Sequence, residues 1–193
     1  MALPTYNKSH RRQSFEQLPK AAYVVEIKSA KEDKNKKDDG SHLTIFFDVA
    51  EGEYQNYYRK RYDSNQNEDK KWPNDGIFYL TVPSAGCQEY VLTNWNTFFA
   101  DLEDSNNGFV FSGDVKTLKG KLIGAKMCIE QSEYNGRIYD HTKWKWTCVA
   151  EDVRHGKAGQ LPNDKLIQQS ASPSSGSGWT SMAQIPDDDL PFS

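Results

Sequence analysis

Residues 21–157 alternate short apolar runs with turn signals, and this alternation limits the chain to a fold built mainly of β-strands. Every second side chain of residues 43–50 is apolar, so these side chains share one face of a strand. Further strands are predicted at residues 23–30, 54–62, 77–82, 122–131 and 138–149. Only residues 89–102 carry apolar side chains at the spacings of three and four that a helix requires.

The predicted order of these elements is three strands, one helix and a two-stranded hairpin, with the 54–62 strand continuing the second strand after a turn or bulge. Asn135-Gly136 tolerates the positive φ angles of a tight hairpin turn. This order is that of an OB-fold, a small Greek-key barrel whose sheet face and loops bind oligonucleotides. We therefore predict a mainly β, OB-fold-like five-stranded barrel with one helix, followed by a disordered C-terminal tail.

The length of 193 residues suits one domain with flexible ends. Residues 1–20 are polar and are predicted to be a flexible N-terminal segment, and residues 21–157 form the domain. Residues 158–193 include the low-complexity stretch Ser-Ala-Ser-Pro-Ser-Ser-Gly-Ser-Gly. Such a stretch has no side chains that could offset the entropy lost on ordering. We expect a disordered linker there, ending in an acidic tip for protein interaction.

The formal net charge of −3 belongs to this tail. From residue 161 onward the chain has one lysine and four aspartates, which is the whole acidic excess, so the first 160 residues are neutral. The net charge therefore neither supports nor excludes a nucleic-acid partner. Local clusters of basic residues are the better guide to nucleic-acid binding.

The sequence also argues against several other classes. The longest apolar stretches fall short of the roughly 20 residues of a membrane helix, and the N-terminus lacks the apolar segment of a secretory signal. The three cysteines are too widely spaced to suggest a disulfide framework or a zinc site. We predict a cytoplasmic protein with no membrane partner, no cofactor and no metal.

Motifs for catalysis are missing as well, since the four histidines are isolated and neither a phosphate-binding glycine loop nor a nucleophile elbow occurs. The chain is therefore predicted not to be an enzyme. A metal-dependent nuclease stays open as an alternative, because its acidic residues can be scattered along a sequence.

The last residues carry the most specific signal, the run Ile185-Pro186-Asp187-Asp188-Asp189-Leu190-Pro191-Phe192. This run, after a Gly/Ser-rich linker, resembles the acidic tip of bacterial single-stranded-DNA-binding proteins (SSBs). The resemblance implies that Phe192 enters a basic pocket on replication, recombination and repair proteins, toward which the aspartates steer. In that family the Phe is the last residue, whereas here Ser193 follows it. An ordinary acidic solubility tail is the alternative.

A second resemblance covers much of residues 21–157 and is carried by three segments, Asp48-Val-Ala-Glu-Gly-Glu-Tyr54, Tyr58-Arg-Lys-Arg-Tyr62 and Leu118-Lys-Gly-Lys-Leu-Ile-Gly124. They resemble a family of phage proteins of unassigned function that is widespread in phages of Gram-positive bacteria. This resemblance implies a phage or prophage origin and a binding role. SSBs occur as monomers, dimers and tetramers, so a homo-oligomer is among the expected states.

Basic residues alternate with aromatic ones in residues 57–62, and on a strand Tyr57, Arg59 and Arg61 would share one face. Cations hold phosphates, while aromatic rings stack on bases whatever the sequence. We therefore predict that this strand contacts single-stranded DNA; an edge strand protected by charges is the alternative.

Basic and aromatic residues alternate again in the last predicted strand, at residues 143–146. Trp144, Trp146, Cys148 and Ile138 share a parity and are predicted to lie in the core. The candidates for DNA contact are four residues on or beside the opposite face and one in a loop, namely Tyr139, Lys143, Lys145, Lys126 on the neighbouring strand, and Trp72. For Trp72, an anchoring role in its own loop is the alternative.

Together these features predict sequence-independent binding and protection of single-stranded DNA in phage replication and recombination. The acidic tip would recruit partner proteins to the coated strand. The alternative is a protein-interaction adaptor with the same OB-fold and little affinity for DNA.

Overall fold

The computed structural model describes residues 15–35 and 40–167 of the chain. The predicted tip at residues 185–192 and most of the predicted tail and N-terminal segment lie outside the described residues. The described part contains five strands, namely β1 (Ala22–Lys34), β2 (Ser41–Val49), β3 (Ile77–Thr81), β4 (Leu122–Tyr134) and β5 (Arg137–Cys148).

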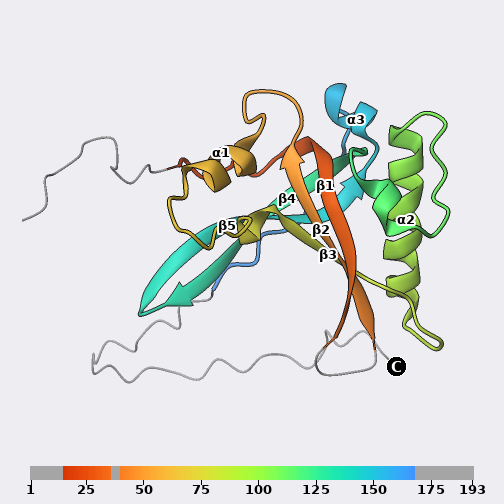
Figure 1. Ribbon diagram of the computed structural model, residues 1–193, viewed down its shortest axis with the longest axis horizontal. Coiled ribbons are helices and arrows are strands. Elements are labelled where there is room, and N and C mark those ends of the chain that lie inside the picture. The colour runs from red at the N-terminus through yellow and green to blue at the C-terminus, as the bar shows by residue number, and fades with distance from the viewer. Residues whose placement is uncertain (1–14, 36–39, 168–193) are drawn as a thin grey trace, which may run out of the picture.

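These strands form one antiparallel sheet in the order β3-β2-β1-β4-β5 (Figure 1). The prediction of a mainly β fold with five strands is confirmed. The edge strands β3 and β5 run in the same direction, because each is separated from the central β1 by two antiparallel steps. The sheet curls so that these two edges face one another across a hollow. This arrangement is compatible with a partly open OB-like barrel.

The core lies inside the curl of the sheet, where all four alternating residues of β2 are buried, as the sequence predicts. The helix α2 (Glu89–Ser105) lies between β3 and β4 in the chain and packs beside the sheet (Figure 1). It buries Phe98, Phe99 and Leu102 against the core. The hairpin between β4 and β5 turns at Asn135 and Gly136, whose φ angles of 52° and 71° confirm the predicted turn.

One predicted strand is wrong, since residues 57–64 form the helix α1 (Tyr57–Ser64). The carboxylate of Asp48 accepts hydrogen bonds from the backbone N–H groups of Tyr58 and Arg59, at 2.9 and 3.0 Å, and so caps the start of this helix. The cap comes from ten residues upstream, and the local run of aromatic and basic residues gives no sign of it. Tyr58 is fully buried and packs edge-on against Phe47.

The described part has a further helix that the sequence did not predict, α3 (Ala150–Arg154), and two short 3₁₀ turns, η2 (Asn74–Gly76) and η3 (Val115–Leu118). After α3 the chain returns to β4, where Lys165 bridges Glu130 as a short parallel strand would. In residues 15–35 and 40–167, no helix is long and apolar enough to cross a membrane.

Candidate nucleic-acid interface

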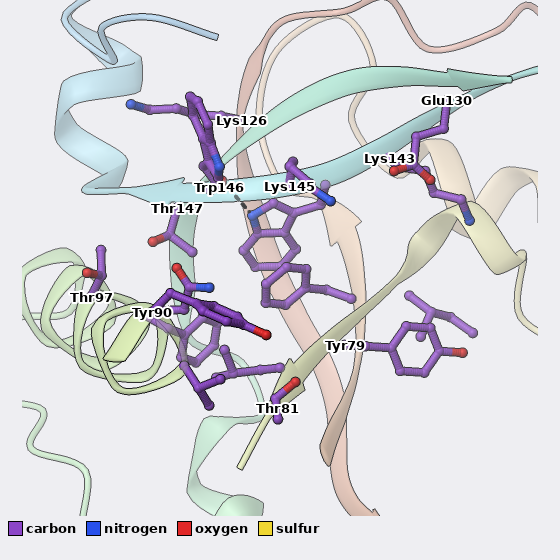
Figure 2. A pocket seen from close by; sticks show the side chains of 17 residues that line it. Tyr79, Thr81, Tyr90, Thr97, Lys126, Glu130, Lys143, Lys145, Trp146 and Thr147 are labelled. Carbon is purple, nitrogen blue, oxygen red and sulfur yellow. Dashed lines mark hydrogen bonds between the residues drawn. The ribbon is translucent and has the colours of Figure 1, made fainter. Parts of the chain in front are cut away.

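A hollow of about 670 Å³ opens between the two edge strands of the sheet. We call it the β3–β5 hollow; its walls are β3, the first half of α2, and the part of β5 from Lys143 to Thr147 (Figure 2). Its floor is aromatic and belongs to the core, because Phe78 stacks on Trp144 with ring centroids 4.3 Å apart. The hollow is therefore continuous with the core inside the curled sheet.

Three aromatic side chains stand on the rim of this hollow and are largely exposed. Tyr79 on β3, Tyr90 on α2 and Trp146 on β5 are 60, 62 and 47% exposed (Figure 2). Tyr90 and Trp146 present ring surface to solvent at the hollow, where a base can stack on it, whereas the ring of Tyr79 points away from these two and packs edge-on against His42 (Figure 2). None of these three residues was among the DNA-binding residues predicted from the sequence.

The charged residues of the β3–β5 hollow are three lysines and one glutamate. Lys126 on β4 lies beside Trp146, its direct partner in the β4–β5 register, while Lys143 and Lys145 come from β5 (Figure 2). The glutamate is Glu130 on β4. The excess of positive charge next to exposed rings is the combination that binds a phosphate backbone with its bases turned inward.

A β-bulge in the last strand gives Trp146 its exposed position. The register pairs Met127 with Trp144 and Lys126 with Trp146, so that Lys145 is an extra residue without an opposite partner. The predicted core position of Trp146 is therefore wrong, although Trp144 and Cys148 are buried as predicted. Ile138, also predicted in the core, is 36% exposed near the tip of the hairpin.

A second hollow, of about 410 Å³, lies on the other side of Lys143. We call it the Asp75 hollow; its walls are the segment of residues 15–18, the helix α1, Asp75 in η2, and residues 139–142 of β5. The 15–18 segment is held in place there, because the hydroxyl of Tyr57 donates to the carbonyl of Glu16 and the hydroxyl of Thr142 donates to that of Leu18.

Asp75 brings three basic side chains from two elements to one point. Its carboxylate lies 3.0 Å from Lys143 Nζ, 3.6 Å from Arg61 Nη1 and 3.5 Å from His141 Nδ1. The same ammonium of Lys143 donates to the carbonyl of Asn74 at 2.9 Å. Lys143 also lines the β3–β5 hollow, so this ion pair is where the two hollows meet.

The structure divides the eight predicted DNA-binding residues into three groups. Lys126, Lys143 and Lys145 line the β3–β5 hollow. Tyr57, Arg61 and Tyr139 line the Asp75 hollow, Tyr57 and Arg61 one helical turn apart with the guanidinium 5.5 Å from the centre of the ring. Arg59 and Trp72 line neither hollow.

Arg59 and Trp72 are both occupied by local contacts. Since residues 57–62 are helical, Arg59 does not share a face with its predicted neighbours; it pairs with Asp63 one turn later, at 2.9 Å. The indole of Trp72 donates to the carbonyl of Gly76 at 3.1 Å and its ring packs on Tyr62. For Trp72 the geometry is that of the loop anchor, the alternative to stacking on a base.

Within the described ranges, no group of three or more His, Cys, Asp or Glu side chains is placed to hold a metal ion. A scan against models of protein families found no match to this chain, and a search of curated proteins found none either.

Proposed function

We propose that the protein binds single-stranded DNA along the β3–β5 hollow, without preference for sequence. The observation that carries the proposal is the lining of this hollow, where three lysines lie near the exposed rings of Tyr90 and Trp146 at the open edge of the curled sheet. The lysines bind phosphates, and the rings of Tyr90 and Trp146 stack on bases. A duplex keeps its bases stacked on one another, so only a single strand can use these rings.

The proposed role is to coat and protect the strand in phage replication and recombination, in the cytoplasm of a bacterial host. The support for this context is the resemblance of residues 185–192 to the SSB tip, together with the phage-protein resemblance of the domain. In this proposal Asp187, Asp188 and Asp189 steer the tip toward basic surfaces of replication and recombination proteins. Leu190, Pro191 and Phe192 then make the apolar contact.

The test is fluorescence anisotropy of a labelled oligothymidine at two salt concentrations, with a duplex as control. We expect salt-sensitive binding of the single strand alone. Trp146→Ala should weaken it by about 1–3 kcal/mol through lost stacking, and Lys145→Ala should reduce the slope of log K against log salt by about 0.7, one phosphate contact.

The matched controls are Tyr134→Ala and Lys119→Ala, which change exposed residues that line neither hollow. Both should leave the affinity and the salt slope unchanged. If the wild-type protein does not bind the strand at low salt, the proposal fails and the adaptor becomes the better hypothesis. Degradation of the strand on addition of magnesium would point instead to the nuclease.

A further inference from the structure

The Asp75 hollow is separate from the β3–β5 hollow but adjoins it. Lys143 is common to both, because its side chain lines the β3–β5 hollow while its ammonium binds Asp75 in the wall of the other. A strand leaving the first hollow along β5 therefore meets the second hollow next. The ammonium of Lys143 lies at the junction, where the phosphate between two neighbouring nucleotides would pass.

One side of the Asp75 hollow offers a free aromatic ring. Tyr139 on β5 lines the hollow and is 44% exposed. The ring of Tyr57 differs, since it packs edge-on against Tyr58 and lies under the guanidinium of Arg61. Tyr139 is thus an exposed ring in this hollow on which a base can stack, and Phe15, which is 36% exposed, lines the hollow as well.

Behind the wall of the hollow, a buried polar group has no hydrogen-bond partner among the described residues. Tyr58 lines the wall and is fully buried, and within the described part of the chain its hydroxyl makes no hydrogen bond. Burial raises the pKa of this hydroxyl far above its usual value, and the neighbouring Asp75 raises it further. A buried hydroxyl left without a partner costs free energy, and the edge of a base that reached it from the adjoining hollow would supply the missing hydrogen bond.

The charges of the hollow favour a base over a phosphate. Its two carboxylates, Asp75 and Asp140, oppose the positive charge of Arg61 and the neighbouring Lys143. A phosphate placed inside would face both carboxylates, whereas the edge of a base offers hydrogen-bond donors as well as acceptors. The phosphates remain outside, near Lys143 and Arg61.

We infer that the Asp75 hollow is a second subsite for the same strand, which takes up one base, stacks it on Tyr139 and hydrogen-bonds its edge. The inference rests on the proposed function and extends it, because it sets the path of the strand along β5 from one hollow into the other. It also predicts that a strand long enough to reach both hollows binds more tightly than one that fills the first alone.

The experiment compares two labelled oligothymidines, of about 4 and about 16 nucleotides, which bracket the site sizes known for OB-folds. Each is titrated with wild-type protein, with Tyr139→Ala and with Trp146→Ala. Tyr134→Ala, which removes an exposed tyrosine of the same hairpin, is the matched control. We expect Tyr139→Ala to weaken the 16-mer about tenfold and the 4-mer less than twofold, while Trp146→Ala weakens both.

Two results would overturn the second subsite while leaving the proposed function intact. In one, Trp146→Ala weakens the 16-mer but Tyr139→Ala does not. In the other, Tyr139→Ala weakens both lengths equally, which would make the Asp75 hollow part of the primary site. If neither oligonucleotide binds the wild-type protein, it is the proposed function that fails, and the inference falls with it.

Discussion

The hydroxyl of Tyr58 is buried, and no protein group within the described residues forms a hydrogen bond with it. Its ring is well packed, with Phe47 5.3 Å away and Tyr57 5.0 Å away, so that the polar atom alone is out of place. Natural cores keep few such groups, because each loses its hydrogen bonds to water and gains nothing in return.

Removal of this hydroxyl should therefore stabilise the free protein. We expect Tyr58→Phe to raise the free energy of unfolding by about 1 kcal/mol or more, measured by urea denaturation without DNA. Tyr134→Phe, at a position that is 68% exposed, is the control and should change nothing. A loss of stability in Tyr58→Phe would contradict the prediction and show that the hydroxyl is bonded in solution.

Single residues of the site were only partly predictable from the sequence. The alternation of lysine and tryptophan at residues 143–146 made Lys143 and Lys145 candidates, the neighbouring strand added Lys126, and all three line the β3–β5 hollow. Tyr90 was missed because it belongs to a helix whose apolar residues form part of the core. Its place beside Trp146 depends on how α2 packs against β5, which the local sequence does not record.

Among the elements, α1 depends on a contact from outside itself. Asp48, at the end of β2, is fully buried and accepts from the backbone N–H groups of Val49, Tyr58 and Arg59. Burial raises the pKa of this carboxyl, and the three N–H donors act in the opposite direction. A carboxylate has two oxygens to serve three donors, whereas an amide has one.

We therefore expect Asp48→Asn to lower the free energy of unfolding by about 1–3 kcal/mol, because backbone N–H groups at the start of α1 lose their acceptor. Urea denaturation measures the loss, and the far-ultraviolet circular dichroism of the variant should show less helix. Asp69→Asn, in an exposed loop, is the control. Equal stability of Asp48→Asn and the wild type would mean that the amide replaces the carboxylate as a cap.

Most other elements could be predicted, and the exceptions have a common cause. The strands of 43–50, 77–82 and 122–131 and the helix of 89–102 have periodic apolar faces, which local sequence records directly. The helix α1 and the bulge at Lys145 do not, since one is set by Asp48 from β2 and the other by the register against β4. A single extra residue changed the face of Trp146, because side chains of a strand alternate at every position.

Across the whole molecule, residues 161–167 tie the end of the described chain back to the sheet. Asp164 accepts from the backbone N–H of Ile129 at 2.8 Å and pairs with Lys20 at 2.9 Å. The backbone of Lys165 donates to the carbonyl of Ile129 and accepts from the N–H of Gln131. These bonds join the N-terminal segment, β4 and the C-terminal segment at one place.

The contacts of the Asp164 carboxylate with Ile129 and Lys20 should weaken in acid. The Ile129 N–H and Lys20 lower the pKa of Asp164 below its ordinary 3.8, so the contact is fully present above that value and is lost as the pH falls through the lowered pKa. We expect the amide resonance of Ile129 to titrate with a midpoint below 3.8 in NMR spectra. Asp164→Asn should abolish that titration, and a midpoint at or above 3.8 would contradict the assignment.

The same hydrogen bonds between residues 164–165 and β4 determine how a mechanical force on the C-terminal segment would act on the domain. A force directed along this segment, which pairs with β4 in parallel at Lys165, would shear the bonds of Lys165 to Ile129 and Gln131, at 2.8 and 2.9 Å, together. Hydrogen bonds that are sheared bear the force together. Hydrogen bonds that are peeled break one after another, at a lower force. Such a force would therefore be transmitted to β4, the strand beside Lys143, Lys145 and Trp146 of β5.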